Sequence, residues 1–279
     1  MNNKVKTALI VALSLFGAGV IIFLCVSMSV HFDYSKLSTN FQIGTNNEAR
    51  IKAEHIDKDI EASGQDIKLS LISVDVTVTQ SADDMIHISY DNSENTYFKL
   101  NDSASQLTLT QEENGKFFFG FLNQNDKHNE VVLSVPAGHD GALTINGVSS
   151  DISISGIEIL KNFKIHSVSG EVYAENVKTS SMELQTVSGD ITLKNVAGQK
   201  ASLSTTSGGV ELNRVDFTEI IYNTVSGDIE GTVRGAPEDY TVYTKTISGE
   251  NSLSAHKGRG ERTLDLSSTS GSFDISFEK

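Results

Sequence analysis

Thr186-Val-Ser-Gly-Asp-Ile191 is the stretch that decides the fold, because related hexads recur through the second half of this 279-residue chain. The other six copies are Gly147-Val-Ser-Ser-Asp-Ile152, Ser167-Val-Ser-Gly-Glu-Val172, Thr205-Thr-Ser-Gly-Gly-Val210, Thr224-Val-Ser-Gly-Asp-Ile229, Thr246-Ile-Ser-Gly-Glu-Asn251 and Ser268-Thr-Ser-Gly-Ser-Phe273. Their central serines follow one another at spacings of 20, 19, 19, 19, 22 and 22 residues. A fixed period of this size indicates a repeat architecture in which each unit stacks on its neighbours.

The residues between two hexads predict strands, not helices. In the unit 190–208, apolar and polar residues alternate on both sides of an Asn195-Val-Ala-Gly198 turn, as in short half-buried strands. A propeller blade would need about 40 residues, so these units are too small for blades. Parallel stacking would instead pair the backbone groups of each unit with the units above and below, at about 4.8 Å. The sequence therefore predicts an all-β fold, a parallel β-solenoid or β-helix with rungs of about 20 residues.

The part before the hexads is less regular but also predicts strands. Period-two alternation runs through residues 66–71, 74–79, 85–90 and 106–110, and a further strand over 131–135 ends at Pro136. We therefore expect one β-strand-repeat domain over 49–279, with irregular strands over 49–146 and regular repeats over 147–279. The polar, aperiodic stretch 32–48 is expected to be a linker.

The N-terminal segment predicts where the domain lies. Residues 7–30 form 24 residues without a charge. As a helix they would extend roughly 36 Å, enough to cross a hydrocarbon core of about 30 Å. Lys4 and Lys6 precede this segment and Asp33 follows it, so the positive-inside rule puts the N-terminus in the cytoplasm. We expect a cytoplasmic tip and single transmembrane helix over 1–31, a juxtamembrane linker over 32–48 and an extracellular domain over 49–279.

Of two alternatives for this segment, a cleaved signal is less favoured and a lipoprotein is rejected. A cleaved secretory signal would have a shorter apolar region, and residues 26–29 offer only poor cleavage sites. A lipoprotein would use Cys25, but the bulky Leu24 stands where such a signal needs a small residue. Because Cys25 is the only cysteine, no intramolecular disulfide is expected, which suits a Gram-positive surface.

The charge excludes some partners. The chain carries a formal charge of -14, and removing Lys4 and Lys6 leaves -16 from Asp33 onward. An acidic surface repels phosphate backbones, so nucleic acid is not expected as a partner.

The hexads, the Val135-Pro136 strand end and the N-terminal apolar segment together resemble the bacterial putative-adhesin family, the LiaG-like group of membrane-anchored domains of unknown function with β-strand repeats. The resemblance covers roughly residues 49–279. It implies a surface-exposed β-solenoid, in proteins often linked to cell-envelope stress. It implies no enzyme activity and supplies no catalytic residues.

The acidic position of the hexads would form a row along a stacked rod. Like charges about 5 Å apart repel unless solvent or a cation screens them. A calcium-binding ladder is one interpretation, since carboxylates suit that ion; we favour a solvated row with a structural role, and expect no cofactor. The positions are Asp151, Glu171, Asp190, Asp228 and Glu250, and the serine–glycine pairs before them include Ser169, Gly170, Ser188, Gly189, Ser226, Gly227, Ser248 and Gly249.

An aromatic segment is the most apolar patch outside the N-terminal stretch. It contains Phe117, Phe118, Phe119 and Phe121 between polar flanks. Such a patch could bind a partner, but we favour a strand or cap that covers the first rung of the solenoid. Residues 235–239 and 256–262 lie in the two longer repeats and are expected to bulge from the rod near its C-terminal end.

The function expected from these features is non-enzymatic. The seven histidines show no metal-binding spacing, and the sequence has no nucleophile elbow, phosphate loop or dinucleotide fingerprint. We expect a membrane-held module that binds an envelope or surface ligand, either a protein or a cell-wall polymer, or that senses envelope stress. The alternatives are a carbohydrate-active β-helix enzyme (a lyase or hydrolase) and a purely structural spacer.

Overall fold

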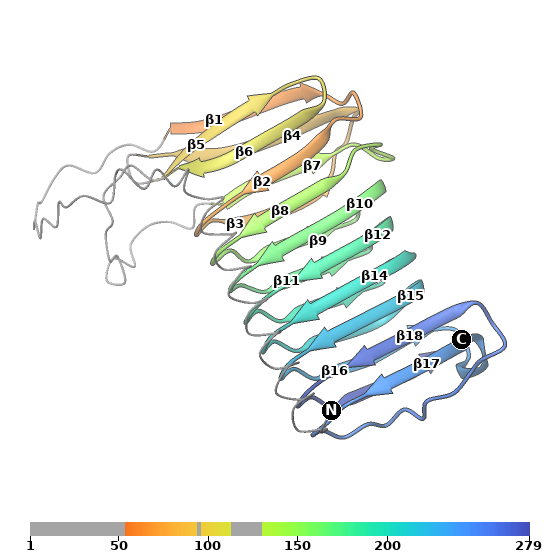
Figure 1. Ribbon diagram of the computed structural model, residues 1–279. Helices are drawn as coiled ribbons and strands as arrows, with labels where there is room; N and C mark the ends of the chain where they lie inside the picture. Colours follow the sequence, from red (N-terminus) through yellow and green to blue (C-terminus); the bar gives the residue numbers. More distant parts are fainter. Residues whose placement is uncertain (1–53, 94–95, 113–129) are drawn as a thin grey trace, which may run out of the picture.

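The computed structural model describes residues 54–93, 96–112 and 130–279, which form one all-β rod (Figure 1). Two sheets lie back to back along it, and 19 strands build them. The expected transmembrane segment and linker lie outside the described residues. Over the part of the chain that is described, no helix is long and apolar enough to cross a membrane.

The regular half confirms the predicted parallel solenoid. In each rung a short strand in one sheet, here sheet A, is followed by a strand in the other, sheet B. Sheet A holds β9 (Ile152–Ser155), β11 (Val172–Glu175), β13 (Ile191–Lys194), the start of β15 (Val210–Thr224), β16 (Ile229–Arg234) and β19 (Phe273–Glu278). Sheet B holds β8 (Leu143–Gly147), β10 (Glu158–Ser167), β12 (Lys178–Gln185), β14 (Ala197–Thr205), the end of β15, β18 (Arg262–Ser267) and β17 (Tyr240–Lys245).

The alternation in the sequence places the core between the two sheets. In β11, Val172 and Ala174 are buried while Tyr173 and Glu175 face outward, and the neighbouring strands follow the same pattern. The corner between the sheets needs a left-handed backbone, which Asn tolerates better than most residues. Asn176 and Asn195 take φ of 55° and 50° there, so the Asn195-Val-Ala-Gly198 segment begins at a turn as predicted.

The hexads form the opposite corner, where neighbouring rungs come very close. A Cβ on Gly189 would collide with the carbonyl oxygen of Gly170, and one on Gly208 with that of Gly189. Of the hexad glycines only Gly170 has a positive φ, 139°. Close approach, not backbone handedness, is therefore why glycine recurs in the hexad. The hexad threonine contributes as well, since the Thr186 Oγ1 accepts the Gly189 N–H at 2.9 Å.

The N-terminal end departs from a purely parallel stack. The strands here are β1 (Glu54–Glu61), β2 (Asp66–Ser70), β3 (Asp75–Gln80), β4 (Met85–Asn92), β5 (Tyr97–Asp102), β6 (Gln106–Glu112) and β7 (Glu130–Val135). The β2–β3 rung comes first in sequence but lies between the β6–β7 and β8–β9 rungs. Beyond β6–β7, β4 pairs antiparallel with β7, β1 with β4, and β5 with β6. Antiparallel strands therefore close this end of both sheets.

The C-terminal end departs from sequence order. The chain passes from β16 to β17, the outermost strand of sheet B, and then returns so that β18 lies between β15 and β17. Residues 235–239 form the exposed turn with a short 3-10 helix, η2 (Pro237–Asp239). The second insertion does not simply bulge, because His256 pairs with Val242 on the outer edge of β17. Before it, the hexad residue Asn251 pairs with Phe273 of β19. The extra residues supply the length for this return path.

Candidate functional site

The acidic row runs along the edge of sheet A and is tied together by hydrogen bonds. Aspartate carboxylates accept backbone N–H groups from the next rung. The donor and acceptor pairs are Asp151 to Asp75 at 3.0 Å, Glu171 to Asp151 at 2.8 Å, Gly209 to Asp190 at 2.7 Å and Ser272 to Asp228 at 2.7 Å. The row continues to Glu250, whose N–H bonds the Ser272 Oγ at 3.3 Å. An aspartate here stabilises the turn one rung further on, as a capping residue does.

Two members of the row were missed by reasoning from the hexads. Asp75 lies one rung before Asp151, and Glu130 is the residue paired with Asp75 on β7. The available signal was an acidic residue directly before an alternating strand, since Asp75-Val76 and Glu130-Val131 match the Asp190-Ile191 step. Neither residue belongs to a hexad, because no serine–glycine pair precedes it.

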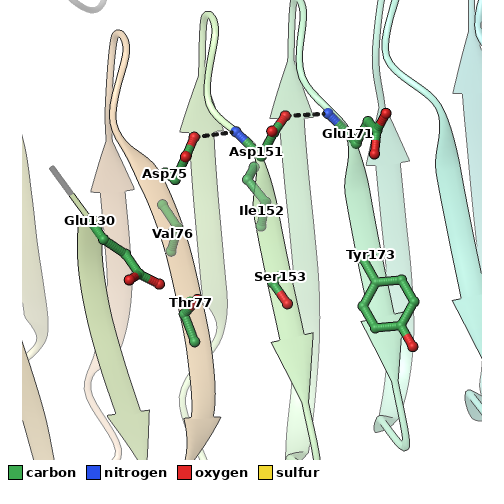
Figure 2. Close-up of a pocket in the computed structure, with 9 residues that line it drawn as sticks. All are labelled: Asp75, Val76, Thr77, Glu130, Asp151, Ile152, Ser153, Glu171 and Tyr173. Carbon is green, nitrogen blue, oxygen red and sulfur yellow. Dashed lines mark hydrogen bonds between the residues drawn. The ribbon is translucent and has the colours of Figure 1, made fainter. Parts of the chain in front are cut away.

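A shallow depression of about 350 Å³ lies on sheet A at this part of the row (Figure 2). Small side chains leave it open: Thr77 and Ser153 face outward in neighbouring strands, and Tyr173 follows them in register on β11. Acidic side chains occur at the β7, β3, β9 and β11 positions beside it. These are Glu130, Asp75, Asp151 and Glu171.

Tyr173 is held in place at the side of this depression. Its hydroxyl donates to the Glu175 carboxylate at 2.7 Å, and the Lys194 Nζ contacts the same carboxylate at 2.6 Å. The lysine hydrogen bond, followed by the tyrosine one, lowers the pKa of Glu175, and the Glu175 carboxylate raises the pKa of Lys194. The hydrogen bond to Glu175 raises the pKa of Tyr173. The tyrosine is therefore a neutral hydrogen-bond donor at neutral pH, with its ring fixed on the sheet surface.

The groups around the depression differ in their chemistry. The aspartate carboxylates already accept structural N–H groups, and the threonine, serine and tyrosine lie on an open surface. Among the described residues no group of three or more His, Cys, Asp or Glu side chains could hold a metal ion. The surface offers hydrogen-bond acceptors, hydroxyls and one aromatic ring, which together suit a ligand rich in hydroxyl or amino groups.

Sheet B carries a second group of polar side chains, on β10 and β12. The Lys164 Nζ contacts Glu183 at 2.8 Å, and the Gln185 amide donates to the same carboxylate at 2.9 Å. His166 lies 3.9 Å from Glu183, and burial lowers its pKa, so the imidazole is neutral at neutral pH. Lys164 lies opposite Glu183, and His166 opposite Gln185, in the β10–β12 register. These outward-facing side chains therefore connect two neighbouring rungs.

The predicted site residues that the structure describes fall into two groups. The serines and glycines form the hexad corner, where the Ser188 N–H bonds the Val168 carbonyl at 3.0 Å and the Ser226 N–H bonds that of Thr206 at 2.9 Å. The acidic residues form the row described above. The phenylalanines 117, 118, 119 and 121 lie outside the described residues.

The fold and this surface define the protein as an all-β solenoid that presents polar faces on stacked rungs. The chain belongs to the family described as Toastrack DUF4097, which matches residues 64–279. None of the curated proteins compared with it matches.

Solved structures with a similar fold are known. A "putative adhesin" from Bacteroides fragilis is 16% identical over 80% of this chain and 97% of its own, with a TM-score of 0.54. A "putative adhesin" from Parabacteroides distasonis is 12% identical over 79% of this chain and 97% of its own, with a TM-score of 0.45. A "putative lipid binding protein" from the same organism is 17% identical over 81% and 97%, with a TM-score of 0.42.

Proposed function

We propose that this protein is a non-enzymatic binding module of the cell surface, held at the cytoplasmic membrane by a helix over residues 7–30. In this proposal the rod projects from the membrane, and the depression on sheet A contacts an envelope ligand. The observation that carries the proposal is the fixed Tyr173 ring beside the hydroxyls of Thr77 and Ser153 and the carboxylate of Glu171. The adhesin-like description of the Bacteroides fragilis protein is consistent with such a role.

The chemistry of the surface favours a sugar polymer as the ligand. Aromatic rings pack against the apolar faces of sugar rings, and short hydroxyl and carboxylate side chains exchange hydrogen bonds with sugar hydroxyls. An open, flat surface also accepts an extended chain more readily than a closed pocket does. A cell-wall glycan with neutral or amino sugars fits this surface, while an anionic polymer would be repelled by it.

Binding of the full-length protein to purified cell walls tests the proposal. We expect saturable retention that falls at least several-fold in the double variant Tyr173→Ala, Glu171→Gln. Tyr243→Ala is the matched control, because Tyr243 is an exposed tyrosine on β17 of sheet B, far from the depression. If Tyr243→Ala reduced cell-wall retention equally, the depression on sheet A would not be the binding site.

The same experiment separates the alternatives. A structural spacer would show no saturable retention by any envelope fraction. A lyase or hydrolase would release soluble sugar fragments from the walls over time. Either result would overturn the binding function.

A further inference from the structure

Strand β1 is the most weakly buried strand at the N-terminal end of the rod. Among the described strands it pairs only with β4, along the full length Glu54–Glu61. Ile60 is its only buried side chain, and Ile56 is half-buried. The attachment of β1 therefore depends on one backbone ladder and on the side chains that reach across to β4.

Two histidine–aspartate pairs cross between these strands on the outer face. His55 on β1 lies opposite Asp91 on β4, with 2.7 Å between Nδ1 and the carboxylate. His87 on β4 lies opposite Asp59 on β1, again with 2.7 Å between Nδ1 and the carboxylate. The two pairs have opposite orientation, so each strand supplies one imidazole and one carboxylate.

The second nitrogen of each imidazole also contacts a carboxylate. The His87 Nε2 lies 2.8 Å from Asp83, and the His55 Nε2 lies 3.3 Å from Asp57. A neutral imidazole has one N–H and one lone pair, so it can donate to only one of two flanking carboxylates. An imidazolium donates to both. The two contacts of His87 are thus satisfied fully only when its ring carries a proton. At His55 the Ser89 hydroxyl, 3.3 Å from Nε2, can donate to a neutral ring, but the contact with Asp57 also requires the imidazolium.

We propose that His55 and His87 form a proton-operated clasp that fastens β1 to the rod when protonated and loosens it when neutral. The titratable groups facing the clasp are Asp57 and Asp59 from β1, Asp83 from the turn before β4, and Asp91 from β4. On the other side, β7 presents the uncharged Ser134 beside His87 and begins at Glu130. Loss of both imidazolium charges would leave two carboxylates beside each neutral ring, with no positive charge between them.

The direction of the titration agrees with this geometry. The hydrogen bonds to Asp91 and Asp59 raise the pKa of His55 and of His87, respectively, above 6.5. When the pKa of a histidine is higher in the folded protein than in the unfolded chain, the histidine stabilises the folded form. This stabilisation is complete below the pKa of the unfolded chain and is lost as pH rises through the pKa of the folded protein. Asp83 accepts the Met85 N–H and contacts His87, which lowers its pKa, so its contribution is lost only in acid. The clasp is therefore strongest between about pH 4 and 6.5.

Release of β1 would change the reach of the rod. The strand follows directly after residues 1–53, which contain the segment that we expect to be the membrane anchor. Eight more residues in an extended chain add roughly 26 Å to that connection. At higher pH outside the cell, the depression on sheet A could thus lie further from the membrane anchor.

Amide hydrogen exchange of the full-length protein tests the clasp. The rates are expressed as protection factors, which correct for the pH dependence of exchange in an unfolded chain. We expect the protection of the β1 amides to fall about three- to tenfold between pH 6 and pH 8.5, the range expected for two exposed charge pairs. In the double variant His55→Gln, His87→Gln this fall should disappear. His256→Gln is the control, because the pKa of His256 is also raised, by the carbonyls of Pro237 and Ser254, yet it lies at the far end of the rod.

A β1 that keeps its protection from pH 6 to 8.5 in the unmodified protein would overturn the proposal. So would a pH response that persists in the double histidine variant. If β1 lacks protection in that variant at every pH, Asp59→Asn and Asp91→Asn decide the matter: the clasp requires that they also weaken β1 at pH 6 but have little effect at pH 8.5. These readouts are independent of glycan binding.

Discussion

The backbone N–H of Ser248 bonds the carbonyl oxygen of Thr269 at 3.0 Å, so the sixth hexad of the sequence forms the outermost rung of the rod. The seventh hexad lies inside it, since the Ser270 N–H bonds the Val225 carbonyl at 2.9 Å. The last two repeats have therefore exchanged places. One consequence is that the start of β19 is covered on both sides, since Phe273 pairs with Ile229 of β16 and with Asn251 of the outermost rung.

Arg262 is expected to hold this exchanged arrangement together. Its guanidinium contacts the Asp216 carboxylate at 2.7 Å and donates to the Arg234 carbonyl and the Tyr240 hydroxyl, both at 3.1 Å. Arg262→Ala should destabilise the last rungs by about 2 kcal/mol, because several charge-assisted hydrogen bonds are lost at once. Limited proteolysis within residues 246–261 measures this. Arg259→Ala is the control, and equal cleavage of both variants would contradict the assignment.

Two adjacent glycines allow a sharp test of close packing at the hexad corner. Gly208→Ala should destabilise the rod by about 3 kcal/mol or more, because its Cβ would overlap the Gly189 carbonyl of the rung above. Gly209→Ala should change stability by less than about 1 kcal/mol, since its Cβ would meet only the Asp190 carboxylate at 3.7 Å and the Asp228 carbonyl at 3.9 Å. Thermal unfolding compares the two. Similar melting temperatures would show that the rungs can move apart at this corner.

The repeat predicted the form of the rod well, because a hexad with fixed spacing constrains every rung in the same way. Strand alternation, the Asn195 turn and the row through Asp151, Glu171 and Asp190 all follow from local sequence. The structural role of the acids also follows from stacking, since an aspartate can reach an amide one rung away.

The two ends could not be predicted in this way. At each end the chain skips a rung and returns. No hexad marks the N-terminal return, and the two 22-residue spacings indicate extra residues at the C-terminal end but not the order of the rungs. Any parallel rung can form much the same backbone hydrogen bonds with any other. The order of β17 and β18 therefore depends on long-range side-chain contacts such as that of Arg262 with Asp216. The histidine clasp was missed for a similar reason: His55 and Asp91 are 36 residues apart and meet only through the β1–β4 register.

The acidic row gives a prediction that separates charge from hydrogen bonding. Asp151→Ala removes the acceptor of the Glu171 N–H and should cost about 1 kcal/mol, as loss of a capping side chain does. Asp151→Asn keeps an acceptor oxygen at the same reach and should cost about half as much or less. Denaturant unfolding measures both. If removing the charge with Asn is stabilising by about 1 kcal/mol, repulsion along the row outweighs the hydrogen bond.

Global stability should respond to pH in the opposite sense from the clasp, through His139. This imidazole is buried where the chain crosses from β7 to β8, and its Nε2 donates to the Gln65 carbonyl at 2.9 Å. Burial lowers the pKa of His139 below 6.5. Just below pH 6.5 the imidazole is therefore protonated in the unfolded chain but neutral in the folded protein.

Stability from His139 is accordingly complete above pH 6.5 and is lost as pH falls through the interval between 6.5 and its lowered folded value. We expect the melting temperature of the rod to fall between pH 6.5 and 5, while β1 protection rises towards the lower pH. His139→Gln keeps a donor for Gln65 without the proton equilibrium, so its melting temperature should depend less on pH over that range. Burial also lowers the pKa of His166, which makes His166→Gln the necessary companion variant. An unchanged slope when both histidines are replaced would mean that buried imidazoles do not set the acid stability of the rod.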